Sequence, residues 1–442
     1  MKVFAGLAGK ESKLIHRMII IGLLGVMIGI GGNGWTLERD ADPGLKAAWS
    51  AWRNGEIAEA ERLAGAQPRT DEGRHLLLLC AFVQGKYEAA LSYDQEISPS
   101  YPRSDELNEP VAMAYFHLGR YAEAGRFAQE HKITGSPENI DDALLDFILV
   151  TADHPLKVSL DRVTIIPFAR EISANYFPPF PAEINDQKIT VHLDTGGSFL
   201  YMGPKQAKKL GIEALRCSPV FFNTGKGYRS NYEMCSGIAR TFHLGDALLE
   251  NVPVTIIPTL DLPINYAIFG ASVFEQFLTT MDYPAKRLIL SPRNNPELRR
   301  KHLEMLPQDT VEFPFYLWGV HLMFAKGGVG RDQNLNFVVD TGLVDFRWDK
   351  KLRLRQAAFI APKEKYIKWS GAPVSNREKQ HFEGSLSLGP LEQDDCIITL
   401  ERPGLTLMGD LGGVRIDGFI SHGFIKNYSW TLDFNERKYF FH

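Results

Sequence analysis

Apolar positions recur with helical spacing from about Pro43 to Leu156, whereas after about Asp161 they alternate with polar positions. The first stretch is rich in Ala, Leu and Glu and has few β-branched runs, which favours amphipathic helices. In the second stretch, Gly, Pro and Asn separate short runs of β-branched and aromatic residues, which is typical of strands and hairpins. The pattern predicts a multi-domain protein in which an all-α region precedes an all-β region.

Three segments of the helical region resemble one another. Each has a glycine that ends one helix and, two residues later, an Ile or Tyr that starts the next helix against small Ala residues; the glycines are Gly55, Gly85 and Gly119. Their spacings of 30 and 34 residues resemble tetratricopeptide repeats, whose period is about 34 residues. The resemblance implies helical repeats over residues 43–158 that bind a peptide or a partner protein on a concave surface. An ordinary helical bundle is the alternative.

The N-terminal segment combines basic and apolar residues. An uncharged apolar run over residues 18–32 follows a basic lead of Lys2, Lys10, Lys13 and Arg17. This order is typical of a secretion signal or a short membrane anchor, and the sequence leaves both open for residues 1–34. Six glycines between positions 22 and 34 disfavour a buried core helix. We expect the remainder of the chain to be secreted, periplasmic or membrane-anchored outside the cytoplasm.

Composition narrows the class of protein. The chain has 442 residues, so two or three domains are expected. Its net charge of −4 indicates no general affinity for nucleic acid. Four cysteines without C-x-x-C spacing argue against a disulfide-dense scaffold and a structural zinc site. We expect no metal and no cofactor.

The β-rich region consists of two halves that contain the same motifs in the same order. Asp-Thr-Gly occurs at residues 194–196 and again at 340–342, each time at the end of an apolar strand. Each copy is followed in the same order by a Leu-Gly turn, an apolar segment at 268–274 or 419–425, and a closing strand. The repetition predicts two related lobes, over residues 161–300 and 301–442.

The first lobe resembles the retropepsin-like aspartic peptidases through Asp194-Thr195-Gly196, the helix-like segment 204–212 and Ile268-Phe269-Gly270. Two such lobes in one chain resemble the arrangement in pepsin-like enzymes. The resemblance implies a cleft between two β-rich lobes, with Asp194 and Asp340 as the catalytic carboxylates. It also implies that four neighbouring residues support the catalytic loops: Thr195, Gly196, Thr341 and Gly342.

Two carboxyls suit the hydrolysis of a peptide bond, which needs a base to activate water and an acid to protonate the substrate. Carboxyls that share a site do not both ionise cheaply, so one retains a proton. The ionised carboxyl takes a proton from water, and the protonated one donates toward the scissile carbonyl. The sequence therefore predicts an aspartic endopeptidase whose substrate is a peptide or protein.

In the resembled family a hairpin of the first lobe, the flap, covers the cleft, and the segment from Phe221 to Met234 occupies that place here. Tyr228 is the candidate flap tyrosine, although a surface hairpin tyrosine is an equal alternative. Cys217 and Cys235 flank this segment and are a candidate disulfide outside the cytoplasm.

Other residues depart from the family pattern. Gly197 precedes Ser198 after the first Asp-Thr-Gly, Leu343 follows the second, and Ser421 replaces the equivalent of Gly270. The family's hydroxyl support for the catalytic carboxylates is therefore in doubt. These departures motivate a second hypothesis, a catalytically weak peptide-binding or scaffold protein. Two further alternatives remain open. The chain could fold as one half of a dimer, and the helical region could be an inhibitory prosegment.

Overall fold

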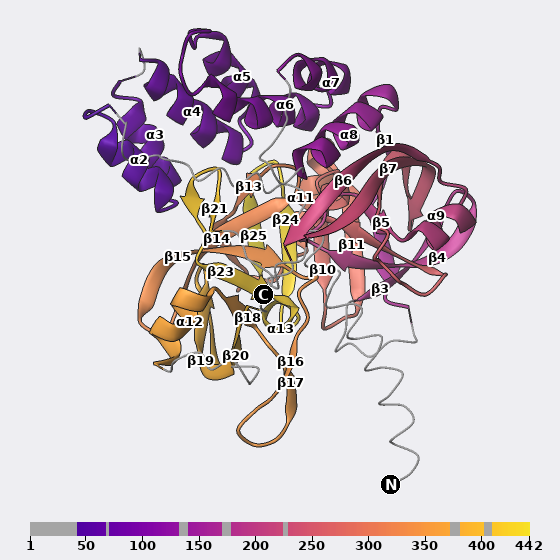
Figure 1. The fold of residues 1–442 in the computed structure, drawn as a ribbon. Coiled ribbons are helices and arrows are strands. Elements are labelled where there is room, and N and C mark those ends of the chain that lie inside the picture. The colour runs from indigo at the N-terminus through magenta and orange to yellow at the C-terminus, as the bar shows by residue number, and fades with distance from the viewer. Residues whose placement is uncertain are drawn as a thin grey trace.

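The computed structural model describes residues 42–67, 70–131, 140–169, 178–223, 229–371, 381–401 and 409–442 (Figure 1). The predicted signal or anchor and the candidate flap residue Tyr228 lie outside these ranges. Within the described residues, no helix is both long enough and apolar enough to span a bilayer. The predicted order, helices first and strands afterwards, is confirmed.

Helices of the N-terminal region form antiparallel pairs, and a single longer helix follows them. The pairs and the last helix are α2 (Lys46–Arg53) with α3 (Ile57–Ala64), α4 (Asp71–Val83) with α5 (Tyr87–Gln95), α6 (Asn108–His117) with α7 (Tyr121–Glu130), and α8 (Ile140–Asp153). Gly55, Gly85 and Gly119 lie between the members of each pair with φ values of 68°, 76° and 72°. Glycine adopts this left-handed conformation without a Cβ clash, so it ends each first helix.

Helix α4 is the buried centre of this region. The side chain of Thr70 accepts a hydrogen bond from the amide of Gly73 and caps its N-terminus. From Leu76 to Val83 every residue is buried. This all-round burial arises because α3 and α5 pack on the helix, and β13 (Tyr316–Trp318) of the second lobe contacts it from another direction.

The first lobe is an eight-stranded sheet in the order β1-β8-β5-β9-β4-β3-β7-β6. Its strands are β1 (Lys157–Ser159), β3 (Pro179–Ile184), β4 (Gln187–Asp194), β5 (Leu200–Met202), β6 (Ala214–Asn223), β7 (Arg229–Leu244), β8 (Ala247–Ile256) and β9 (Tyr266–Gly270). Two short helices, α9 (Pro204–Lys209) and α10 (Ala271–Phe274), follow β5 and β9. Strand β1, at the end of the helical region, already belongs to this sheet.

The second lobe is a seven-stranded sheet in the order β13-β14-β15-β23-β18-β20-β19. The remaining strands of this sheet are β14 (Leu322–Val329), β15 (Asp332–Asp340), β18 (Phe359–Ala361), β19 (His381–Leu388), β20 (Leu391–Leu400) and β23 (Gly418–Ser421). Outside the sheet lie β16 (Phe346–Trp348), β17 (Leu354–Gln356), α12 (Lys363–Ser370), β21 (Asp410–Leu411), β22 (Val414–Arg415) and α13 (His422–Ile425).

The two lobes share one topology around their Asp-Thr-Gly loops. In the first lobe β4 runs parallel to β9, with Asp194 opposite Gly270. In the second lobe β15 runs parallel to β23, with Asp340 opposite Ser421. The strands β5 and β18 pair antiparallel with β9 and β23, respectively. The repetition seen in the sequence is therefore a repetition of strand pairing.

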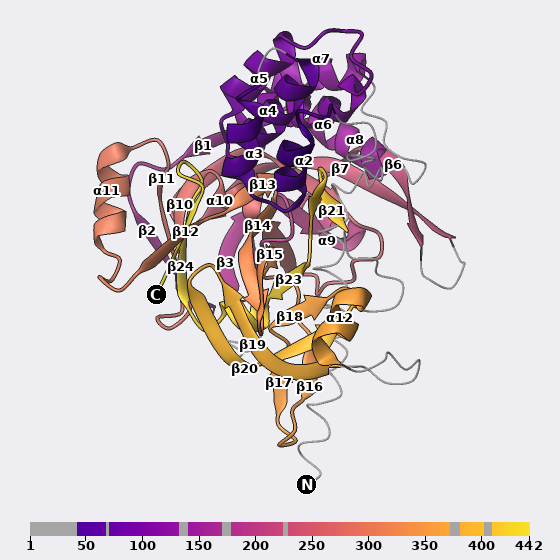
Figure 2. The same cartoon turned by 90° about the vertical axis from the view of Figure 1, so that its left-hand side faces the viewer.

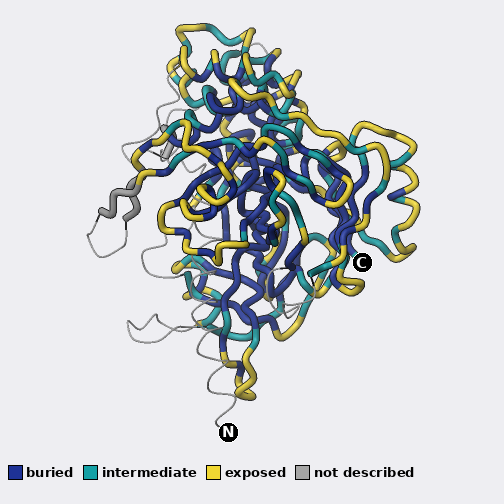
Figure 3. The backbone as a smooth tube through the Cα atoms, turned by 90° about the vertical axis from the view of Figure 1, so that its right-hand side faces the viewer, coloured by how far each residue is buried: buried dark blue, intermediate teal, exposed yellow. Residues whose placement is uncertain are grey.

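A six-stranded sheet joins the lobes in the order β12-β25-β24-β10-β11-β2. Its strands are β2 (Thr164–Pro167), β10 (Phe277–Asp282), β11 (Arg287–Pro292), β12 (Val311–Pro314), β24 (Ser429–Asp433) and β25 (Lys438–Phe441), and α11 (Pro296–Glu304) follows β11. Strands β10 and β24, one from each half of the chain, pair at its centre. Buried backbone is concentrated in the sheets and where they meet the helices (Figure 3).

The helical region packs on both lobes, at one end of the molecule (Figures 1 and 2). From α2, the indole N–H of Trp52 donates to the carbonyl of Gly412 at 2.8 Å, in the second lobe. The buried ring of His117 contacts both lobes, with Nδ1 3.0 Å from a carboxylate oxygen of Glu275 and Nε2 2.9 Å from the carbonyl of Gly319. Each ring nitrogen of His117 therefore lies within hydrogen-bond distance of an oxygen from a different lobe.

Glu275 is the anionic centre of a buried charge network at this junction. Arg437 and Arg293 lie 3.6 and 3.8 Å from its carboxylate, in addition to His117, and Arg437 also donates to the hydroxyl of Tyr87 in α5. Burial alone would raise the pKa of Glu275, but His117 and the two arginines lower it to about 2. The network ties the helical region, the first lobe and the second lobe to one carboxylate.

We predict that Glu275→Ala destabilises the protein by about 3–5 kcal/mol, because it leaves buried cations without their counter-charge. The matched control is Glu304→Ala, since Glu304 pairs with Arg300 on an exposed helix face and should cost less than about 1 kcal/mol. Urea unfolding at neutral pH measures both. Equal losses in the two variants would contradict the assigned role of the network.

Candidate active site

Asp194 and Asp340 stand at the ends of equivalent strands and are both buried, with exposed fractions of 2% and 0%. Each carboxyl is held by its own loop. The amide of Gly196 donates to Oδ1 of Asp194 at 2.9 Å, and the amide of Gly342 donates to Oδ1 of Asp340 at 2.7 Å. The tight turn of each Asp-Thr-Gly tripeptide therefore fixes the rotamer of its aspartate.

Thr195 and Thr341 cross-link the two loops, although they are 146 residues apart in sequence. The amide of Thr195 donates to Oγ1 of Thr341, and the amide of Thr341 donates to Oγ1 of Thr195, both at 3.0 Å. Oγ1 of Thr195 in turn donates to the carbonyl of Val339 at 3.0 Å. These buried hydrogen bonds hold the two loops, and so the two aspartates, against each other.

Gly196 and Gly342 allow the backbone of each loop to approach the opposite carboxyl. A Cβ atom on Gly196 would lie 2.3 Å from Oδ2 of Asp340, and one on Gly342 would lie 2.1 Å from Oδ1 of Asp194. Both distances are far below a van der Waals contact. The glycines are therefore required by the closeness of the two loops, in addition to the turn itself.

The two carboxyls titrate as a coupled pair. Burial raises the pKa of Asp194 to about 6, against hydrogen bonds from Asp340 and from the amides of Gly196 and Gly342 that lower it. Burial, the charge of Asp194 and a hydrogen bond to that carboxylate raise the pKa of Asp340 well above its usual range. The pair therefore shares a proton, and Asp340 is the carboxyl that holds it more strongly.

Ser198 does not support Asp194 through its hydroxyl in the way that the family pattern suggests. The phenol of Tyr201 donates to Oγ of Ser198 at 2.8 Å and accepts a hydrogen bond from the Ser198 amide. Leu343, at the corresponding place in the second lobe, is buried and lies against Asp340 through its backbone amide, which lowers the pKa of that carboxyl slightly. Packing and backbone groups thus take the place of side-chain hydroxyls.

Ser421 and Gly270 differ because the loops beside them differ. A Cβ on Gly270 would lie 2.1 Å from the carbonyl oxygens of Gly197 and Ser198, so the first lobe has no room for a side chain there. In the second lobe the hydroxyl of Ser421 donates to the carbonyl of Ala357 at 2.5 Å. The departure from the family pattern is a local packing difference.

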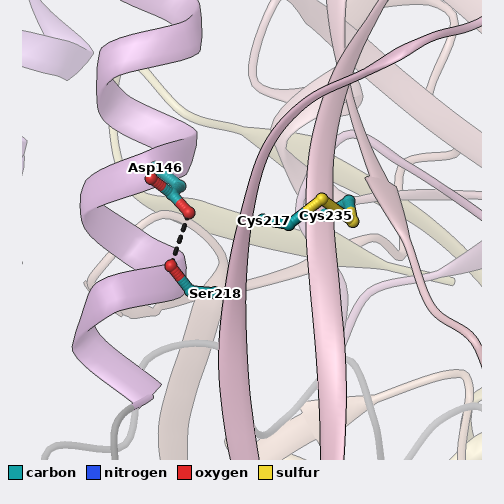
Figure 4. The surroundings of a disulfide bond; sticks show 4 residues. All are labelled: Asp146, Cys217, Ser218 and Cys235. Atoms are coloured by element: carbon teal, nitrogen blue, oxygen red, sulfur yellow. Dashed lines mark hydrogen bonds between the residues drawn. A yellow bond between two sulfur atoms is a disulfide. The ribbon is translucent and has the colours of Figure 1, made fainter.

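Cys217 and Cys235 form a disulfide between the facing strands β6 and β7 (Figure 4). Beside it, Ser218 donates to the carboxylate of Asp146 in α8 at 2.6 Å, so the helical region also contacts the base of this hairpin. The two sulfurs and Glu233 come within 4.8 Å of one another, but bonded sulfurs are not metal ligands. The candidate flap residue Tyr228, which follows β6 in sequence, lies outside the described residues.

Sequence reasoning missed Tyr201 as part of this site. It lies in the short buried strand β5, where an aromatic residue is typical of an ordinary core position. Its ring packs in a small apolar cluster with Met234 and with Ala143 of α8. No signal in the sequence identifies the contact with Ser198, because it depends on how the loop after Asp194 turns back.

Comparison with known proteins identifies a class for the first lobe. Residues 180–273 match the model of the family described as aspartyl protease. A retropepsin-like aspartic protease from Rickettsia conorii is 22% identical with a TM-score of 0.21, and the match covers 30% of this chain and 92% of that one. Basic 7S globulin from soybean is 10% identical with a TM-score of 0.34, covering 63% and 94%, respectively. No curated protein matches the chain. The family match alone indicates an aspartyl-protease-like domain, over residues 180–273 of the chain.

We predict that the aspartate pair destabilises the folded state as pH rises. The pKa of Asp194 is about 6 when folded and 3.8 without the fold, so its stabilising contribution is complete below about pH 4 and is lost through pH 6. At about 1.4 kcal/mol per pKa unit, this carboxyl alone accounts for about 3 kcal/mol at pH 7. The double variant Asp194→Asn/Asp340→Asn should gain at least that much over the wild type between pH 4 and 7, measured by urea unfolding. A difference that is independent of pH would refute the coupling.

We also predict that Gly196→Ala and Gly342→Ala each destabilise the protein by about 1–3 kcal/mol, because the new methyl group overpacks the opposite carboxyl. Gly409→Ala is the control, since a Cβ there meets no atom within 4 Å, and it should change stability by less than about 0.5 kcal/mol. Thermal unfolding of the three variants provides the comparison. Similar stability in all three would show that the loops do not approach as described.

Proposed function

We propose that this protein is an aspartic endopeptidase that hydrolyses peptide bonds with a water molecule activated between Asp194 and Asp340. The observation that carries the proposal is the meeting of the two buried carboxyls, one from each lobe, with a raised pKa on both. The family match over residues 180–273 includes Asp194 and supports the same activity.

In the proposed mechanism the pair works with one proton. Asp194, the carboxyl with the lower pKa of the two, accepts a proton from water as the water attacks the scissile carbonyl carbon. Asp340 donates its proton to the carbonyl oxygen, which gives a tetrahedral diol without a covalent bond to the protein. Asp194 then gives the proton that it took from water to the leaving amine as the C–N bond breaks, and Asp340 takes back a proton from a hydroxyl of the diol. Reciprocal hydrogen bonds of Thr195 and Thr341 keep the pair in place throughout.

The helical region, in this proposal, is a permanent part of the enzyme that recruits a substrate or a partner protein. Its contacts with the lobes are buried and include the charge network around Glu275, so an inhibitory prosegment that detaches is disfavoured. The tetratricopeptide resemblance supports recruitment on the faces of the helices that do not contact the lobes.

We further propose that the enzyme works outside the cytoplasm, either secreted, periplasmic or tethered by residues 18–32. The disulfide between Cys217 and Cys235 supports this location, since such bonds persist in oxidising compartments.

A catalytically weak binding protein is the second candidate. The observation that favours it is the hydroxyl of Ser198, whose oxygen accepts a hydrogen bond from the phenol of Tyr201. In that case the cleft would hold peptides without cutting them.

The test is cleavage of a broad peptide library from acid to neutral pH by the full chain. Asp194→Asn and Asp340→Asn should each lower kcat/KM by at least about 10²-fold, because each removes a group that transfers a proton. Asp246→Asn is the control, since Asp246 pairs with Arg162 on the surface and should leave cleavage unchanged. Undiminished cleavage by either site variant would refute the proposed mechanism, and no cleavage by the wild type would favour the binding protein.

A further inference from the structure

After its Asp-Thr-Gly loop the second lobe contains a hairpin that is absent from the corresponding described residues of the first lobe, 194–200. In the first lobe Leu200, six residues after Asp194, pairs with β9. Its counterpart in the second lobe is Phe359, which pairs with β23 and lies nineteen residues after Asp340. The additional residues form the antiparallel hairpin of β16 and β17. It projects from the end of the molecule opposite the helices in both views (Figures 1 and 2).

One face of this hairpin is apolar and exposed. Trp348 lies directly opposite Leu354 in the strand pairing, so the two side chains share a face, and their exposed fractions are 60% and 54%. Leu352, at the turn, is 79% exposed. The other exposed large apolar side chains among the described residues stand singly along the chain. A cluster of three on one projecting hairpin indicates an interaction surface.

The tip of the hairpin, residues 349–353, is also cationic, and hydrogen bonds to Asp349 hold its turn. Lys350, Lys351 and Arg353 are exposed between the apolar residues. Asp349 is buried and accepts hydrogen bonds from the amides of Lys351 and Arg353 and from the Arg353 side chain, which fixes the turn. Glu383 is the acidic neighbour and accepts the Lys350 amide. Among described residues, neither Lys350 nor Lys351 forms an ion pair, so both charges are free to meet an anionic surface.

The base of the hairpin is anchored to the body of the second lobe. Arg347 forms a buried ion pair with Asp345 and also donates to the hydroxyl of Thr399 in β20. The amide of Ala357 donates to the carbonyl of Asp345 at 2.7 Å and closes the base on the other strand. The projection is therefore a built feature with a fixed direction.

The projecting shape of the hairpin and its positive charge together indicate what kind of surface it binds. Small-molecule sites are concave, whereas this hairpin projects outward from the body of the molecule. A bilayer surface accepts a protruding tip, and Trp and Leu partition into its interfacial zone while Lys and Arg meet anionic headgroups. We propose that the β16–β17 hairpin docks on an anionic lipid surface through Trp348, Leu352 and Leu354, flanked by Lys350, Lys351 and Arg353.

Docking would hold the enzyme at a membrane in a defined orientation. If the apolar segment at residues 18–32 is retained as an anchor, which is one of the two alternatives that the sequence leaves open, it would supply a second attachment to the same membrane. Docking does not depend on catalysis, so the Asp194→Asn/Asp340→Asn variant should dock as the wild type does. Failure of the proposed peptidase activity would leave this proposal standing, and the reverse also holds.

The first experiment uses the full chain with vesicles of phosphatidylcholine that contain one quarter phosphatidylglycerol, and with vesicles of phosphatidylcholine alone. Brominated acyl chains quench the fluorescence of a tryptophan that enters the interface. Trp35 neighbours the apolar N-terminal segment, so the signal of Trp348 is the difference between wild type and Trp348→Phe. We expect quenching of this component on the anionic vesicles and little on the neutral ones. Equal quenching on both, or none on either, would overturn the proposal.

The second experiment separates the lysines from general surface charge. Each lysine near an anionic surface contributes about fivefold to binding, so Lys350→Gln/Lys351→Gln should lower the docking equilibrium constant on the order of 20-fold. Lys205→Gln/Lys208→Gln, on the exposed face of α9, is the control with the same change of charge and should have a much smaller effect. Equal effects of the two pairs would overturn the proposal.

Two other binding partners of the hairpin, a substrate and a second copy of the chain, would give different results with the variant Trp348→Ala/Leu354→Ala. If the tip binds substrate, Trp348→Ala/Leu354→Ala raises KM for soluble peptides in the absence of lipid. If it binds a second copy of the chain, that variant changes the oligomeric mass in light scattering. Either result, without a loss of docking on anionic vesicles, would overturn the lipid assignment. Both side chains are exposed, so the variant should keep the wild-type unfolding temperature as evidence that it folds.

Discussion

The reciprocal hydrogen bonds between Thr195 and Thr341 are the contact on which the rest of the structure depends. They bring two carboxyls into one buried site, where burial and mutual repulsion oppose ionisation of both. That arrangement costs stability above the pKa of the pair, and the fold has to offset the cost elsewhere. The offset comes from contacts between segments that are distant in sequence, above all the β10–β24 pairing of the sheet that joins the lobes.

The helical region adds to this offset because it packs on both lobes. Trp52 contacts the second lobe, Asp146 contacts the first, and His117 contacts both. The buried carboxylate of Glu275 contacts basic side chains from the helical region, the first lobe and the second lobe. Motion of one lobe relative to the other would break these contacts, so the helices help to keep the aspartates in register. The region has a structural role beside any recruitment of partners.

Much of this organisation could be predicted from the sequence, because the same motifs recur along the chain. The doubled Asp-Thr-Gly tripeptide indicated two lobes, and the recurrent glycines at 55, 85 and 119 indicated the helix pairs. The tripeptides also predicted which two carboxyls meet. Local patterns carry this information because strand ends and helix ends are set by nearby residues.

The remainder depends on contacts between distant segments. Tyr201 looks like a core residue until the loop after Asp194 folds back on it, and nothing near His117 in sequence indicates Glu275 as its partner. The inserted hairpin cannot be predicted for a different reason: its two strands are only three residues each, and Trp348 and Leu354 on them are exposed. Strand patterns are recognised by an apolar face that is buried, and this hairpin exposes its apolar face.

The proposed chemistry depends on a proton that Asp194 and Asp340 share. Carbon-13 NMR of the aspartate carboxyls, titrated in the wild type and in Asp340→Asn, measures this sharing. We expect two carboxyl signals that titrate well above the usual range of aspartate, and a titration of Asp194 that shifts when Asp340 is replaced. Two signals that each titrate near 3.8, with the titration of Asp194 unchanged by the replacement, would show that the two carboxyls share no proton.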